Sequence, residues 1–225
     1  LVGGTGVSDF TWIKFSGATK GVNVNLAQNL VSDDGQGGQD TLLNITSVQG
    51  TPFADVLVGN SSGNIFMPGA GNDSIDGGAG NNDVVIYNDL SVGAVINLKT
   101  GIASSSEMGT DTLVNIEAAH GTLGNDTITM SDNGGYVYAE RGDDKIYGGN
   151  NGGYINGGDG NDTIYAGSGG GSYQGEAGND LIVGGVGQDA IDYNGGNVNV
   201  QSITVASTGT FAWNLNLGST PVLSV

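Results

Sequence analysis

Apolar residues return at every ninth position along much of the chain. From residue 121 to residue 192 the sequence divides into eight blocks of nine without a slip, and the eighth residue of each block is apolar or aromatic. These residues are Ile128, Val137, Ile146, Ile155, Ile164, Tyr173, Ile182 and Ile191. A second stretch, from residue 50 to residue 85, runs in the same phase, with Leu57, Phe66, Ile75 and Val84 at that position. Most other positions hold Gly, Asn or Asp, which favour turns.

This spacing predicts a parallel β-solenoid. One inward apolar residue with a neighbour on each side predicts a three-residue strand, and the six residues between strands predict a turn. Two strands and two turns would close one coil of 18 residues. Coils would stack about 4.8 Å apart, and the inward residues would form two facing ladders that no single repeat could bury. We therefore predict an all-β fold, a parallel β-roll of 18-residue coils with flanking β-strands.

The sixth position of the block carries the candidate chemistry. In alternate blocks it is Asp126, Asp144, Asp162 and Asp180, which would form one column along an edge of the solenoid. Carboxylates stacked about 5 Å apart repel one another unless a cation lies between them. A hard divalent cation takes six to eight oxygens from carboxylates and backbone carbonyls, and a Gly-rich turn exposes its carbonyls. We therefore expect a metal on this edge.

The opposite edge differs in its sixth positions. There the blocks hold Gly135, Gly153 and Gly171, so we expect no metal along that edge, although Asp189 breaks the alternation and is a candidate ligand. In the first half, Asp55 and Asp73 would share one edge, and Asn64 and Asn82 the other. Asp40 and Asp111 are candidate end ligands.

Three blocks carry a family resemblance. GGDGNDTIY at residues 157–165 resembles the RTX, or haemolysin-type, nonapeptide G-G-x-G-x-D-x-U-x, and GEAGNDLIV at 175–183 and PGAGNDSID at 68–76 are close to it. The resemblance implies a parallel β-roll, Ca²⁺ held between successive turns, and secretion to a calcium-rich exterior. The candidate ligands are the carboxylates and glycine carbonyls of Asp55, Asp73, Gly124, Asp126, Gly142, Asp144, Gly158, Gly160, Asp162, Gly178, Asp180 and Asp189.

The amino-acid composition argues against several classes of protein. The chain has 225 residues, 44 of them Gly, with no Cys and a formal net charge of -18. Nucleic-acid binding requires clustered Lys and Arg, so we expect no nucleic-acid partner. No apolar run approaches membrane-spanning length, so we expect no transmembrane segment. A disulfide scaffold or a thiolate zinc site is excluded.

A longer internal repeat encloses the short one. VNVNL at residues 22–26 matches AVINL at 94–98, and DTLLNI at 40–45 matches DTLVNI at 111–116. We therefore divide the chain into five segments. They are an N-terminal β flank (1–39), a first RTX-like block (40–85), a strand-and-loop excursion that repeats 12–49 (86–120), a second RTX-like roll (121–192) and a C-terminal β tail or cap (193–225). We expect the stacked coils to begin near Asp40, loops at 27–39 and 99–110, and antiparallel-type strands in the tail.

No group of residues predicts an active site. His120 is the one imidazole and reads as a packed or surface residue. The G-x-S-x-G match at residues 59–63 falls inside a repeat rather than on a strand-to-helix turn. Adjacent Asp143 and Asp144 would point apart. The tyrosines that flank inward positions predict an aromatic ladder between coils, with a carbohydrate or partner surface as the alternative. We expect no enzymatic activity.

We expect an extracellular structural module that folds with calcium and builds a bacterial surface layer or filament. Self-association or cell-surface polysaccharide would provide the partner. The chain has no initiator Met or signal peptide, consistent with an excised or exported product. The alternatives are an accessory module of a secreted protease, lipase or alginate epimerase, or a segment of an adhesin.

Overall fold

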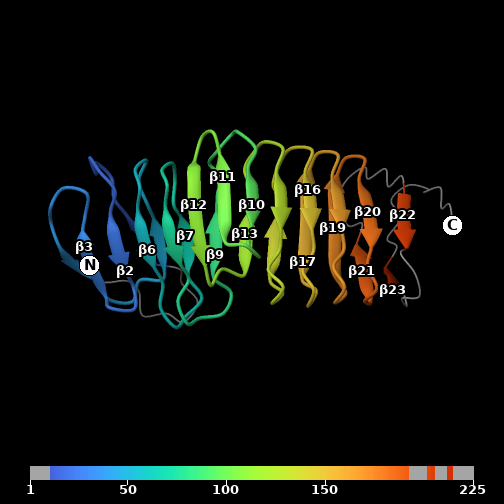
Figure 1. Ribbon diagram of the computed structural model, residues 1–225, viewed down its shortest axis with the longest axis horizontal. Helices are drawn as coiled ribbons and strands as arrows, with labels where there is room; N and C mark the ends of the chain where they lie inside the picture. The colour runs from blue at the N-terminus through green and yellow to red at the C-terminus, as the bar shows by residue number, and fades with distance from the viewer. Residues whose placement is uncertain (1–10, 193–201, 206–211, 215–225) are drawn as a thin grey trace.

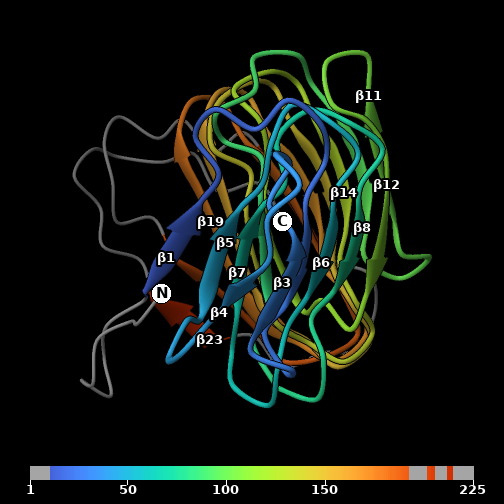
Figure 2. The ribbon, with the colours of Figure 1, turned by 90° about the vertical axis from the view of Figure 1, so that its left-hand side faces the viewer.

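The computed structural model describes residues 11–192, 202–205 and 212–214. These residues form strands, turns and bends without a helix, as predicted for an all-β chain. Short strands stack along the long axis of the molecule, with the first strands at one end and the last at the other (Figure 1). Seen along this axis, two sheets face each other across a narrow interior (Figure 2). The fold is a parallel β-roll.

Among the described residues one sheet has ten strands, and every neighbouring pair is parallel. In order they are β1 (Trp12–Lys14), β5 (Ser47–Gln49), β7 (Ile65–Met67), β9 (Val84–Ile86), β13 (Ala118–His120), β15 (Tyr136–Tyr138), β17 (Tyr154–Asp159), β19 (Gly171–Ala177), β21 (Asp189–Asp192) and β23 (Ala212–Asn214).

The other sheet has thirteen strands in the part of the chain that the structure describes. In order they are β22 (Ser202–Val205), β20 (Leu181–Gly184), β18 (Thr163–Tyr165), β16 (Lys145–Tyr147), β14 (Thr127–Thr129), β10 (Val95–Asn97), β11 (Ile102–Ser105), β12 (Gly109–Val114), β8 (Ser74–Asp76), β6 (Val56–Val58), β2 (Asn23–Asn25), β3 (Leu30–Asp33) and β4 (Asp40–Thr41). Its extra strands belong to two antiparallel meanders, β2–β3–β4 and β10–β11–β12.

The 18-residue register is confirmed in the second half of the chain. Ile128 stands against Ile146, Ile146 against Ile164, and Ile164 against Ile182. In the facing sheet Ile155 stands against Tyr173. All of these side chains are buried, so the eighth positions form the two facing apolar ladders expected of stacked coils.

The first half departs from the predicted phase by one residue. Val85, not Val84, stands against Phe66 in the core row, because the turn before β9 is one residue longer. Asp83 consequently takes the place predicted for Asn82 beside Asn64. The parallel stack also begins earlier than Asp40, since β1 already pairs with β5 and β2 with β6.

The segments expected as loops contain strands. β3 lies within 27–39, and β11 lies within 99–110, and each folds back antiparallel on the strand before it. β4 pairs antiparallel with β3 and completes the first meander. The two meanders are the two copies of the longer internal repeat.

The two described strands of the tail continue the roll in parallel, where antiparallel strands were expected. β22 adds in parallel to β20, and β23 adds in parallel to β21. The rest of the predicted C-terminal tail, at 193–201, 206–211 and 215–225, and residues 1–10 of the N-terminal flank lie outside the described residues. The boundaries of the five segments stay a prediction.

Candidate metal centre

A ladder of aspartates runs along the edge where the turns enter the thirteen-stranded sheet. From Asp144 onward, one carboxylate oxygen of each aspartate accepts the backbone N–H of the aspartate one coil earlier. The Asp126 N–H donates to Asp144 Oδ1 at 2.7 Å, that of Asp144 to Asp162 Oδ1 at 2.9 Å, and that of Asp162 to Asp180 Oδ1 at 2.9 Å. The column predicted from the 18-residue spacing is therefore present, and it joins each coil to the next.

In three of these four aspartates the second oxygen is buried without a hydrogen-bond partner. This holds for Oδ2 of Asp144, Asp162 and Asp180 within the described part of the chain. Each of these residues is at most 2% exposed. The Oδ2 atoms of Asp162 and Asp180 lie directly against the α-carbons of Gly157 and Gly175, where a side chain would collide with them. A buried carboxylate oxygen without a partner is costly, and a bound cation would offset that cost.

The raised pKa values of the ladder aspartates also favour a bound cation. Burial, together with the neighbouring charges of Asp126 and Asp162, raises the pKa of Asp144 to about 8. Burial likewise raises the pKa of Asp162 to about 7. Burial also raises the pKa of Asp180. A bound cation would reverse this penalty because it favours the ionised carboxylate.

The first half holds a second, shorter ladder. The Asp55 N–H donates to Asp73 Oδ1, and the Asp73 N–H donates to Asp111 Oδ1, both at 2.8 Å. Asp73 Oδ2 has no partner in the described structure, and burial raises the pKa of Asp73 to about 8. Asp111 Oδ2 accepts the hydroxyl of the buried Tyr87 at 2.8 Å. Asp111 therefore ends this ladder, whereas Asp40 lies in β4, outside the column.

Two of the predicted ligands have their oxygens occupied by protein donors. Asp126 accepts the backbone N–H groups of Ala94 and Thr122 and the Thr122 hydroxyl, at 2.6, 2.7 and 2.8 Å. Asp55 makes the same three bonds with Val22 and Thr51. The threonine four residues before the aspartate thus supplies hydrogen-bond donors that Asp144 and Asp162 do not have.

The opposite edge contains a carboxylate that the sequence did not indicate. The Asn64 N–H donates to Asp83 Oδ1 at 2.7 Å, and the Asp83 N–H donates to Glu117 Oε2 at 2.9 Å. Asp83 Oδ2 is buried and unpartnered within the described residues. Burial raises the pKa of Asp83 to about 6. The nine-residue phase did not predict Asp83, because the turn before β9 has one extra residue. The signal that could have identified it is the Gly-rich run at residues 77–80, which precedes it.

Asp189 is the other buried carboxylate on this edge. Its Oδ2 accepts the Gly185 N–H at 2.8 Å, whereas its Oδ1 has no partner among the residues described. Burial raises the pKa of Asp189. Gly135, Gly153 and Gly171 occupy the intervening coils, each aligned with the position 18 residues away. No carboxylate column connects Asp83 to Asp189.

The carboxylate and carbonyl oxygens along this edge suit a hard divalent cation. In the described ranges, no three acidic or imidazole side chains converge on one point. A cation between coils would therefore need backbone carbonyls to complete a set of six to eight oxygens. The carbonyl oxygens of Gly142 and Gly160 face the glycines of the next coil, on the ladder edge. Bound Ca²⁺ would supply charge neutralisation, held by Asp144, Asp162 and Asp180 with carbonyls of their turns.

The comparison with protein families agrees with this chemistry. A family model described as the RTX calcium-binding nonapeptide repeat matches four segments of the chain, 49–84, 135–153, 154–173 and 172–198. The chain carries RTX calcium-binding nonapeptide repeats. The matched segments contain Asp55, Asp73, Asp144, Asp162, Asp180 and Asp189, while Asp126 lies outside them. No curated protein matches the chain.

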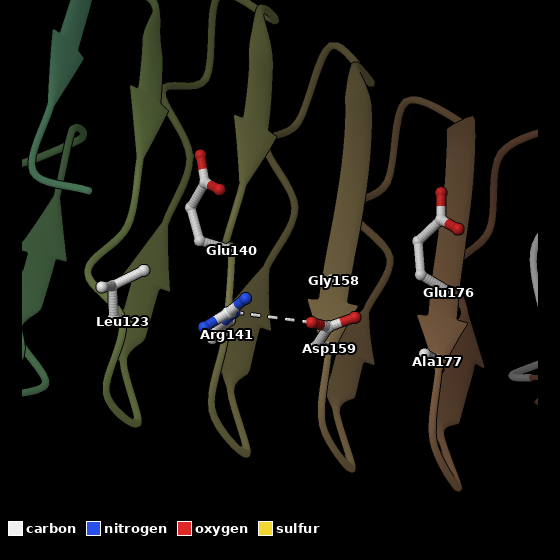
Figure 3. Close-up of a pocket in the computed structure, with 7 residues that line it drawn as sticks. All are labelled: Leu123, Glu140, Arg141, Gly158, Asp159, Glu176 and Ala177. Atoms are coloured by element: carbon white, nitrogen blue, oxygen red, sulfur yellow. Dashed lines mark ion pairs between the residues drawn. The ribbon is translucent and has the colours of Figure 1, made fainter. Parts of the chain in front are cut away.

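A shallow groove runs beside the Asp126–Asp180 ladder, along the second and third residues of every other block, which belong to successive coils (Figure 3). Its lining includes Glu140, Arg141 and Asp159, and Arg141 Nε lies 3.6 Å from Asp159 Oδ2. Glu140 Oε1 contacts His120 Nδ1 at 2.7 Å, and the His120 ring stacks on Tyr138. These contacts place the imidazole in a packed surface cluster, as predicted.

The aromatic ladder is also confirmed. The Tyr147 and Tyr165 rings stack with centroids 5.1 Å apart, and Lys145 Nζ lies over both rings. On the other sheet, the Tyr138 and Tyr154 centroids are 5.6 Å apart. The tyrosines therefore pack on one another from coil to coil.

Proposed function

We propose that this chain is a non-enzymatic structural module that folds when calcium binds its RTX coils and builds an assembly on the cell surface. The observation that carries the proposal is the row of buried carboxylate oxygens without partners, at Asp73, Asp144, Asp162 and Asp180. RTX repeats are calcium-binding and typically occur in secreted proteins. Nowhere in the described ranges is there an apolar helix of membrane-spanning length.

Calcium occupancy would contribute much of the stability. Extracellular calcium sites have dissociation constants of about 10⁻⁴ to 10⁻³ M. At ten times the dissociation constant, each site adds about 1.4 kcal/mol to the free energy of unfolding. Three or four such sites would supply a large share of the roughly 5–15 kcal/mol typical of a domain. Without calcium, the charge of -18 opposes folding.

Far-ultraviolet circular dichroism of the full chain tests the proposal. After metal removal with EGTA we expect loss of the β signal, recovery with calcium and poor recovery with magnesium, which prefers octahedral sites and keeps its water. Metal analysis of the refolded chain should give about four calcium ions, or six if end sites fill. An unchanged spectrum after verified metal removal would contradict calcium-dependent folding.

A further inference from the structure

The shallow groove at the ends of β17 and β19 crosses three successive coils. Two residues of each coil line it, and Leu123 lies at one end: Glu140 and Arg141, Gly158 and Asp159, and Glu176 and Ala177. Figure 3 shows Glu140 and Glu176 on either side of the bare Gly158. Two carboxylates therefore border an open floor.

The two glutamates occupy backbone positions that favour glycine. Glu140 has a φ of +77° and Glu176 a φ of +67°, whereas Gly158 on the coil between them has a φ of +97°. This left-handed conformation is disfavoured for residues that carry a side chain, and such strain gathers at functional sites. A β-carbon at Gly158 would collide with the Glu140 carbonyl oxygen, so the floor of the groove must stay bare.

Each glutamate is held in place by one of its two carboxylate oxygens. Glu140 Oε1 lies 2.7 Å from His120 Nδ1 and accepts Asn88 Nδ2 at 3.4 Å. Glu176 Oε1 accepts Asn156 Nδ2 at 2.8 Å. The other oxygen, Oε2, makes no hydrogen bond to a described residue in either glutamate. Both carboxylates are thus oriented in advance for a donor from outside, which lowers the ordering cost of binding.

The charge of the groove defines its partner. Glu140, Asp159 and Glu176 line it, and Arg141 is the one cation in this lining. Arg141 Nε lies 3.6 Å from Asp159 Oδ2, so it balances Asp159 and leaves the two glutamates uncompensated. The whole chain has a formal net charge of -18. Charge complementarity therefore requires a positively charged partner.

A tyrosine beside the groove also suits a cation. The Tyr138 side chain is 36% exposed, and its ring stacks on His120, the residue that contacts the first glutamate. The face of a tyrosine ring attracts ammonium and guanidinium groups. The other sheet shows the same contact within the chain, where Lys145 Nζ lies 5.5 and 5.7 Å from the ring centroids of Tyr147 and Tyr165.

The spacing of the glutamates favours an extended chain over a metal ion. Glu140 and Glu176 are two coils apart, which corresponds to about 10 Å between their backbones. In the ranges that the structure describes, no three acidic or imidazole side chains meet at one point. An extended peptide advances about 3.3 Å per residue, so basic side chains three positions apart would reach both carboxylates.

We propose that this groove binds an extended basic segment of a partner protein. One Lys or Arg side chain pairs with Glu140 beside Tyr138, and a second pairs with Glu176. The inference rests on the proposed function, since calcium must first order the three coils, and it names the chemistry of a partner for the module. Because the pairs are exposed at the surface, binding weakens as salt is added.

Fluorescence anisotropy with a labelled oligolysine peptide, on the full chain in calcium, is the test. The same peptide with its lysines acetylated is the neutral control, and we expect it not to bind. For Glu140→Gln combined with Glu176→Gln we expect affinity for oligolysine to fall about five- to tenfold. Asp33→Asn combined with Asp132→Asn removes two surface charges elsewhere, at the partners of Lys20 and Lys99, and should change affinity less than about twofold.

Three results would overturn the assignment of the groove. They are a chain that folds with calcium but does not bind oligolysine, equal affinity for the acetylated peptide, which would indicate a neutral ligand, and equal losses in the two double variants. Glutamine keeps the acceptor oxygen that holds each side chain, and far-ultraviolet spectra would verify folding of both variants. A folded chain without binding would leave calcium-dependent folding intact, so the two proposals fail separately.

Discussion

Each ladder aspartate has two oxygens with different surroundings. In Asp162, Oδ1 accepts the Asp144 N–H at 2.9 Å, while Oδ2 is buried without a partner among the described residues. The first oxygen fixes one coil against the next, and the second is the proposed calcium ligand. One side chain therefore couples coil stacking to metal binding.

Asp162→Asn separates these two roles. The amide oxygen can still accept the Asp144 N–H, so the metal-free chain should be no less stable than before. The two calcium sites that share Asp162 should be lost, which removes about 3 kcal/mol of calcium-dependent stability at ten times the dissociation constant. Thermal melts with calcium and with EGTA would measure both effects. Asp159→Asn, an exposed change of the same charge, is the control, and an equal loss there would refute the assignment.

The threonine-held aspartates predict a different outcome. The Thr122 hydroxyl donates to Asp126 Oδ1 at 2.8 Å and accepts the Gly124 N–H at 3.1 Å. Thr122→Val removes both bonds in a buried turn and should lower the free energy of unfolding by about 1–2 kcal/mol. Calcium stoichiometry, measured by isothermal titration, should not change. A lost calcium ion in this variant would mean that Asp126 is a ligand after all.

At the scale of the element, the short strands are joined by turns whose backbone lies in close contact with the backbone of the neighbouring coil. Gly160 has a φ of +146°, and a β-carbon there would collide with the carbonyl oxygen of Gly142 in the preceding coil. Glycine is required at this position for both its conformation and its lack of a side chain. The sequence pattern of the turn therefore follows from the close approach of stacked coils.

Gly160→Ala should lower the free energy of unfolding by about 2–4 kcal/mol, because it adds a steric collision to backbone strain. Gly37→Ala is the matched control. Gly37 has a φ of +95°, but its β-carbon would meet nothing within 4 Å. We expect a loss of about 1 kcal/mol there, from backbone strain alone. Urea unfolding in calcium would compare the two variants, and equal losses would show that inter-coil contact is not the cause.

At the scale of the whole molecule, the roll encloses a thin core beside the two ladders of buried aspartates. Burial raises the pKa of Asp73 and Asp144 to about 8 and that of Asp162 to about 7. An unfolded chain has aspartate pKa values near 3.9. Between about pH 4 and pH 8, the metal-free folded chain therefore holds protons that the unfolded chain has released.

The sign of the pH dependence follows. The free energy of unfolding of the metal-free chain should fall as pH rises from 5 to 8, because the unfolded state binds fewer protons across this interval. With saturating calcium the aspartates are ionised, so this loss should disappear and protons should be released on binding. Melting temperatures at pH 5 and pH 8 in metal-free buffer would measure the effect. A higher value at pH 8 would contradict it.

The repeat by itself determined the local fold and most of the site. A nine-residue period with one inward apolar residue can be buried only by stacking coils, so the rows Ile128–Ile146–Ile164–Ile182 and the Asp126–Asp180 column follow from spacing alone. These contacts are formed between neighbouring coils, and a regular period fixes which residues are neighbours.

Only the tertiary structure decided where the period breaks. The extra residue before Val85 brought Asp83 rather than Asn82 to the edge, and the meanders turned expected loops into strands of the wider sheet. The threonines at 51 and 122 satisfied Asp55 and Asp126, which the repeat pattern had grouped with the proposed ligands. Such differences depend on which groups meet across coils of unequal length, and that pairing is set by packing rather than by distance along the chain.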